Sequence, residues 1–74
     1  MDKITGVLHY NPDTDRMGIT VADLWEVTGL YCGDLLDIWI NGEWILDRIE
    51  LSNTWYLVNS NLKGSQLEGL EVRY

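Results

Sequence analysis

Apolar and polar residues alternate along several short segments of this chain, the pattern of strands that bury one face. In residues 4–10, Ile4, Gly6, Leu8 and Tyr10 fall on one side and the residues between them on the other. Residues 16–21 alternate in the same way. Between the two segments lies a run of Asn, Pro and Asp, residue types that preset or stabilise a chain reversal. The pattern predicts a first hairpin over residues 4–21.

The dipeptide Asn41-Gly42 predicts a second hairpin, because both central positions of a type I′ turn require a positive φ. Apolar-rich segments, 35–40 and 43–51, flank it on both sides. The two-residue loop fixes the register of the strands. It pairs Ile40 with Glu43, Trp39 with Trp44, Ile38 with Ile45, Asp37 with Leu46 and Leu36 with Asp47.

This register sorts the second hairpin into two faces. The core face is expected to hold Leu36, Ile38, Ile40, Ile45 and Ile49. The other face carries Trp39, Trp44, Leu46, Asp37 and Arg48. Asp47 falls on the core side, and we expect a bulge or the end of the strand to rotate it outward.

The remaining segments complete an all-β fold. Residues 22–29 mix helical spacing with extended-backbone preferences and are expected to be a connection with room for one helical turn. Residues 55–59 and 70–74 are predicted as short strands, separated by a polar loop over 60–66 with Gly64 at positive φ. Five to six short antiparallel strands in residues 1–74 predict a single domain, a small SH3-like barrel or roll.

The length of the chain and its single cysteine bear on the number of domains and on the cellular location. A chain of 74 residues has room for one core. Its single cysteine, Cys32, cannot form an internal disulfide, which favours a reducing, cytoplasmic location, and we expect it to be a small core residue. The amino terminus lacks a basic leader, and no run approaches the roughly 18 apolar residues of a membrane span. Neither export nor membrane insertion is expected.

Charge and residue types disfavour several classes of function. Twelve acidic against five basic residues give a net charge of -7, which repels nucleic-acid phosphates and anionic lipids and favours a basic protein surface as partner. Asn11, Asp13 and Asp15 have the spacing of a calcium loop, but Arg16 and Ala22 stand where that loop needs Gly and Glu. The chain has one His and one Cys and no zinc or phosphate-binding motif. We therefore expect no metal, no cofactor and no enzymatic activity.

Several short motifs together resemble a known family. They are the segments 6–11 (GVLHYN), 16–19 (RMGI), 30–34 (LYCGD), 41–45 (NGEWI), 48–50 (RIE), 55–58 (WYLV) and 69–73 (GLEVR). The chain is similar to a family of short, uncharacterised bacterial proteins, a domain of unknown function found mainly in Firmicutes and often near mobile elements. These motifs are turn glycines and packing aromatics, so the resemblance implies a shared fold and no catalytic residue. The chain departs from the family mostly between Thr20 and Gly29.

Three hypotheses for function follow. In the first, a noncatalytic module binds another protein through an aromatic patch, with anchors Trp39, Trp44, Trp55 and Tyr56. In the second, an acidic nucleic-acid mimic inhibits a host defence or DNA-binding protein through Asp13, Asp15, Asp23, Glu26, Asp34, Asp37 and Glu43. In the third, strand edges or the Trp patch pair with a second copy in a small homo-oligomer. The alternative for the Trp39–Trp44 pair is burial beneath residues 22–29 or another strand.

Overall fold

The computed structural model describes residues 3–74 and consists of strands with one short 3-10 helix. The strands are β1 (Thr5–Asn11), β2 (Arg16–Val21), β3 (Leu24–Val27), β4 (Leu35–Ile40), β5 (Glu43–Leu51), β6 (Trp55–Leu57) and β7 (Glu71–Arg73), and the helix is η1 (Gly64–Leu67). All strand pairs are antiparallel, in the order β3-β2-β1-β7-β4-β5-β6. The predicted all-β class is confirmed.

The sheet is open, so the closed SH3-like barrel expected from the sequence is not observed. The strands at its two ends, β3 and β6, do not pair with each other in the described chain. Each end is protected instead. β3 holds an extra residue, because Ile19 pairs with Val27 while Thr20 pairs with Trp25. The outer side of β6 is covered by a bridge between Tyr56 and Lys63. Bulges and covering loops of this kind discourage further strand pairing.

The first hairpin forms as predicted, and Asn11 explains why its turn is tight. The Asn11 side chain is buried. Its Oδ1 accepts a hydrogen bond from the Asp13 backbone N–H at 3.0 Å, and its Nδ2 donates to the Thr28 carbonyl at 3.0 Å. Asp15 adopts a φ of 56°, a conformation that Asp tolerates. The turn is therefore anchored to the chain between β3 and β4.

The prediction for residues 22–29 is wrong, because this segment contains the strand β3 rather than a helical turn. Ala22 and Asp23 have φ values of 52° and 64° and form a two-residue hairpin loop. Val21 then pairs with Leu24, so β3 extends the first hairpin to three strands. The loop lacks the glycine that normally marks such a turn.

The second hairpin has the register that Asn41-Gly42 predicted, in all five pairs given above. Asn41 and Gly42 have φ values of 53° and 83°, as a type I′ turn requires. Leu36, Ile38 and Ile49 are buried. Ile40 is half-buried against the core, whereas Ile45 is half-buried outside the core cluster, so the period-two pattern assigned four of the five expected core residues correctly.

The hydrophobic core lies on one side of the sheet. It contains residues from both hairpins, β6, η1 and β7. Its members are Leu8, Met17, Ile19, Leu30, Leu36, Ile38, Ile49, Trp55, Leu57, Leu67 and Val72. Cys32 is exposed, which corrects the expectation that it fills the core. It lies in the irregular connection before β4, where Leu30 supplies the buried side chain instead.

Asp47 remains on the core side, contrary to the expected outward rotation, and is 1% exposed. Its Oδ1 accepts hydrogen bonds from the backbone N–H groups of Arg48 (2.7 Å) and Asn59 (2.8 Å), and its Oδ2 accepts one from Ser60 (2.9 Å). Burial raises the pKa of Asp47, but the three N–H donors lower it by more, so the net pKa lies below its ordinary value. The carboxylate thus accepts the hydrogen bonds of two backbone N–H groups in the loop after β6.

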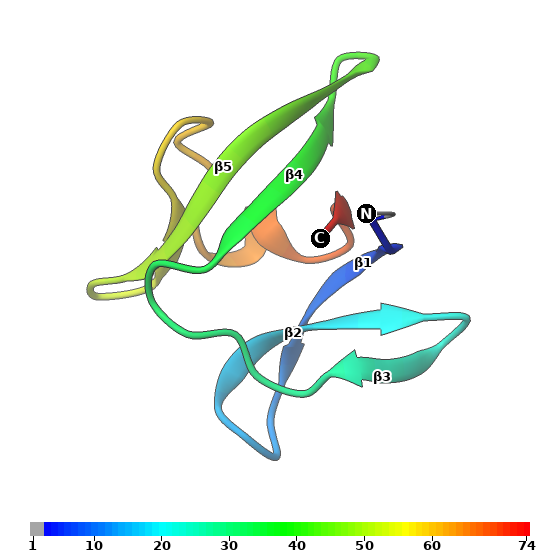
Figure 1. Cartoon of the computed structure of the whole chain (residues 1–74). Coiled ribbons are helices and arrows are strands. Elements are labelled where there is room, and N and C mark those ends of the chain that lie inside the picture. Colours follow the sequence, from blue (N-terminus) through cyan, green and yellow to red (C-terminus); the bar gives the residue numbers. More distant parts are fainter. Residues whose placement is uncertain (1–2) are drawn as a thin grey trace.

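The C-terminal strand β7 joins the two halves of the sheet. It lies between β1 and β4, where Figure 1 shows it as the red arrow. Val72 is fully buried, and Tyr74 exchanges backbone hydrogen bonds with Ile4 at 2.8 and 3.0 Å. The strand predicted over 70–74 therefore exists in shorter form, and its position is central.

Candidate functional site

The most prominent apolar surface is the solvent face of the β4–β5 hairpin. Trp39 and Trp44 face each other across the two strands, with ring centroids 5.1 Å apart and ring planes at 61°. Trp39 is 41% exposed and Trp44 is half-buried. Neither tryptophan belongs to the core cluster, and Trp39 is open to solvent while Trp44 is partly covered.

Two leucines extend this surface. Leu46 is 55% exposed and is the next outward residue after Trp44 on β5. Leu35 is 62% exposed and lies on the same face of β4 as Trp39. We call Leu35, Trp39, Trp44 and Leu46 the hairpin patch. Leu35 was missed in the sequence analysis, although the register that located Trp39 also places it on the outward face.

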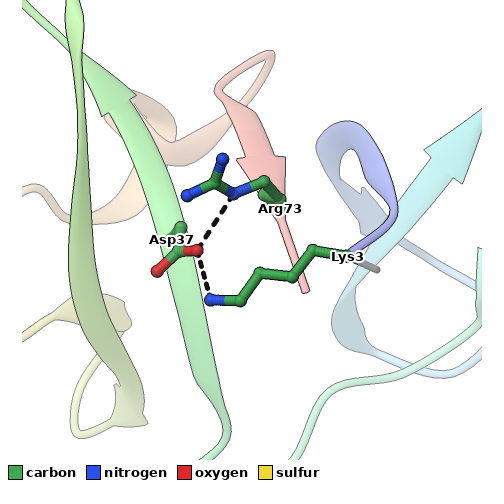
Figure 2. A network of polar contacts seen from close by, with 3 residues as sticks. All are labelled: Lys3, Asp37 and Arg73. Carbon is green, nitrogen blue, oxygen red and sulfur yellow. Dashed lines mark hydrogen bonds and ion pairs between the residues drawn. The ribbon is translucent and has the colours of Figure 1, made fainter. Parts of the chain in front are cut away.

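A polar network holds the edge of the hairpin patch in place (Figure 2). Arg73 Nε donates to Asp37 Oδ2 at 3.1 Å, and the Lys3 ammonium donates to the same oxygen. The Arg73 guanidinium also stacks on Trp44, 4.4 Å from the ring centroid. The position of Arg73 was not accessible from sequence, because it depends on the non-local pairing of β7 with β4.

Asp37 is a structural carboxylate in this network. Its side chain is only 7% exposed. The hydrogen bond from Lys3 lowers the pKa of Asp37, burial acts in the opposite direction, and Arg73 lowers it further, so the pKa is below its ordinary value. Asp37 is therefore charged, paired and inaccessible, and it contributes nothing to an acidic surface.

Two of the four predicted anchors lie away from the hairpin patch. Trp55 is 8% exposed and belongs to the core. Tyr56 is half-buried on β6 and pairs with Glu50, which lies six residues beyond Trp44 on β5. At about 3.4 Å per residue, that separation is roughly 20 Å. The structure therefore brings Trp39 and Trp44 together and leaves Trp55 and Tyr56 elsewhere.

The acidic residues proposed for nucleic-acid mimicry are spread over the molecule. Asp13 and Asp15 lie in the turn before β2, whereas Asp23 lies in the turn after it. Because β2 has six residues, these two turns are roughly 20 Å apart. Glu26 is on β3, Asp34 precedes β4 and accepts a hydrogen bond from the Tyr31 N–H, and Glu43 begins β5. These residues do not form one continuous surface.

The described residues offer little for metal or acid–base chemistry. Within residues 3–74, no group of three or more His, Cys, Asp or Glu side chains is arranged to hold a metal ion. His9 Nδ1 lies 2.7 Å from Glu68 Oε1, and the His9 ring meets the edge of Trp25 at 6.5 Å. Glu68 also accepts the Tyr10 backbone N–H at 2.9 Å, so this pair ties β1 to the end of η1. None of the helical segments in residues 3–74 is long and apolar enough to cross a bilayer.

A comparison with protein families identifies the family of this chain. The model of a domain of unknown function, DUF5348, matches residues 6–74. The chain belongs to this family. A DUF5348 assignment agrees with the resemblance to an uncharacterised domain, while the occurrence mainly in Firmicutes and the association with mobile elements stay predictions.

A solved structure supports the same fold for this DUF5348 domain. It is the crystal structure of a protein from the bacterium Ruminococcus gnavus, determined as a structural genomics target. The two chains are 36% identical, with a TM-score of 0.80, over 96% of this chain and 100% of the other. A search of curated proteins finds no match. Function must therefore be argued from the surface of the domain itself.

Proposed function

We propose that this domain is a noncatalytic protein-interaction module that binds its partner through the hairpin patch, with Trp39 and Trp44 as anchors. The observation that supports the proposal is an exposed, paired tryptophan surface on the face of the sheet opposite the core. Large aromatic side chains in a central, well-packed position contribute most of the binding energy in many interfaces. The cross-strand contact stabilises the hairpin, but it leaves Trp39 and the two leucines exposed on the side of the sheet away from the core.

The anchors are held in place before binding. The cross-strand contact fixes the two rings relative to each other, and Arg73 packs on Trp44 while Asp37 orients the guanidinium. Binding then costs little side-chain entropy, because each immobilised flexible side chain would otherwise cost about 0.5–1.5 kcal/mol. A rigid patch of this type suits a partner with a complementary apolar surface.

The charged residues around the hairpin patch indicate what kind of partner surface it suits. The net charge is -7, but the basic residues Lys3, Arg48 and Arg73 lie on or beside the face that carries the hairpin patch. The hairpin patch is therefore apolar, and the basic residues beside it are paired with the carboxylates of Asp37 and Glu50. We infer a partner protein with an apolar surface that complements the hairpin patch. Acidic mimicry receives less support, because the acidic residues do not converge and Asp37 is buried.

A pull-down from the organism that carries the protein tests this proposal. The immobilised domain is compared with the variants Trp39→Ala and Trp44→Ala, and with Trp25→Ala as a matched control. Trp25 is 39% exposed but lies on β3, outside the hairpin patch. Circular dichroism checks that each variant is folded. We expect a partner that the control retains and that binds Trp39→Ala about 30-fold more weakly, as for a hot-spot residue.

The salt dependence of capture separates the hypotheses. An apolar hot spot predicts similar capture at about 0.05 and 0.5 M salt, whereas acidic mimicry predicts loss at the higher concentration. Recovery of identical partners by all four proteins would contradict the choice of anchors. If light scattering shows that the wild type alone associates with itself, the partner is a second copy and the hetero-partner proposal is wrong.

A further inference from the structure

Two adjoining hollows lie where the turn between β5 and β6 meets the segment that leads into η1. The larger has a volume of about 570 Å³ and is lined by Ser52, Asn53, Thr54, Tyr56, Asn61 and Lys63. The smaller, of about 320 Å³, also has Thr54 in its wall. The larger volume falls within the range of roughly 300–1,000 Å³ that is common for small-molecule sites.

The polar side chains of the larger hollow are not used by the fold. Elsewhere in the chain, Asn side chains bind loops together: Asn11 Nδ2 donates to the Thr28 carbonyl, and Asn59 Nδ2 donates to the Leu46 carbonyl at 2.9 Å. Within residues 3–74, the side chains of Asn53 and Asn61 make no such hydrogen bond. Neither do the hydroxyl groups of Ser52 and Thr54. Their donors and acceptors are available to a ligand.

Lys63 adds a cation to this hollow. Lys3, Arg48 and Arg73 each pair with a carboxylate, and Arg16 donates to a backbone carbonyl. Among the described residues, Lys63 alone of the basic side chains forms neither contact. Lys63 is the charged residue in the lining of the larger hollow, whereas Glu68 lines the smaller hollow beside it. The local charge therefore favours an anionic group beside Lys63.

The chemistry of the lining selects a class of ligand. Amide and hydroxyl side chains offer donors and acceptors together, which matches the hydroxyl groups of a sugar. The half-buried ring of Tyr56 offers an apolar face for sugar C–H groups. An extended peptide is less suitable, because the bridge to Lys63 already covers the edge of β6. We propose that this hollow is a binding site for a short carbohydrate that carries one carboxylate.

NMR titration of the full chain tests the proposal, with backbone amide shifts as the readout. Glucuronate, glucose and acetate are each added up to about 50 mM, a range suited to weak sites. We expect glucuronate to shift amides of residues 52–63 in a saturable manner. The variant Lys63→Gln should weaken glucuronate about fivefold and leave glucose unchanged, because only the ion pair is removed. Asn53→Ala should weaken both sugars.

Matched controls make the outcome decisive. Lys3→Gln removes a cation that pairs with Asp37 on β4, outside the lining, and should leave the titration unchanged. An absence of saturable shifts with glucuronate, or shifts outside residues 52–63, would overturn the proposal. Acetate that saturates the same amides as strongly would show an anion site without carbohydrate recognition, and that result also overturns it. None of these results alters the test of Trp39 and Trp44.

Discussion

The buried carboxylate of Asp47 leads to the sharpest prediction for stability. In the variant Asp47→Asn, the amide oxygen can keep the two hydrogen bonds now made by Oδ1. The amide nitrogen then replaces Oδ2 and faces the Ser60 N–H, a donor against a donor. Because the site is 1% exposed, water cannot compensate.

The expected loss follows from these contacts. A hydrogen bond to a charged group contributes about 1.5–3 kcal/mol, and an unsatisfied buried donor adds to the cost, so we expect the free energy of unfolding to fall by about 2–3 kcal/mol. A domain of this size has a total of roughly 4–11 kcal/mol. The melting temperature should fall by roughly 10–20 °C. The measurement is urea unfolding followed by tryptophan fluorescence at pH 7.

The pH dependence gives an independent check. Because the folded pKa of Asp47 is lowered, its stabilisation is fully present above the unfolded value of about 3.9 and is lost as pH falls through the lower folded value. The difference between wild type and variant should therefore be constant near neutral pH and shrink below about pH 4. Asp13→Asn removes the same charge from an exposed turn and should change stability by less than about 0.5 kcal/mol. A loss below about 1 kcal/mol for Asp47→Asn, or a difference that does not shrink as the pH falls below about 4, would refute this reasoning.

Three further changes test other parts of the fold by urea unfolding. Gly42→Ala places a Cβ at a φ of 83° and should cost about 1–2 kcal/mol; an unchanged midpoint would argue against the type I′ turn. Gly18→Ala puts a Cβ 2.4 Å from the Val27 carbonyl oxygen, so it should cost more than about 2 kcal/mol and separate β3 from β2, seen as a shift in tryptophan emission. Asp37→Asn should cost about 1–2 kcal/mol at pH 7, and the cost should shrink progressively as the pH falls below about 4, because the folded pKa of Asp37 is lowered and its contribution is lost as the pH falls through that lower value. A cost that does not change with pH would show that the ion pairs with Lys3 and Arg73 contribute nothing.

Local turn chemistry determined how much of the fold could be predicted. Asn41-Gly42 specifies a loop length, and the loop length specifies the register, so the pairing of Trp39 with Trp44 followed from sequence. The turn at Ala22 and Asp23 also has positive φ at both central residues but no glycine, and the strand after it was therefore missed. Asp47 was misjudged because its partners come from a loop whose path is set by tertiary contacts.

Some residues of the candidate site could likewise be predicted from the sequence and others could not. The outward face of the hairpin follows from period-two alternation, so Trp39 and Trp44 could be selected without coordinates. Arg73 could not, because its position beside Trp44 depends on pairing between residues more than 30 positions apart. Trp55 illustrates the converse error, since composition alone does not distinguish a core tryptophan from an exposed one.

The central position of β7 has a consequence for how the domain is made. Ribosomes deliver the chain from its amino terminus, so both hairpins emerge before the residues 71–73 that join them. Thr5 and Arg73 lie near opposite ends of the described chain, and closing a loop of this length adds an entropic cost that slows folding. Until that closure, the nascent chain exposes two unpaired edges, on β1 and β4, and the interval between their synthesis and that of β7 is when aggregation is most favoured.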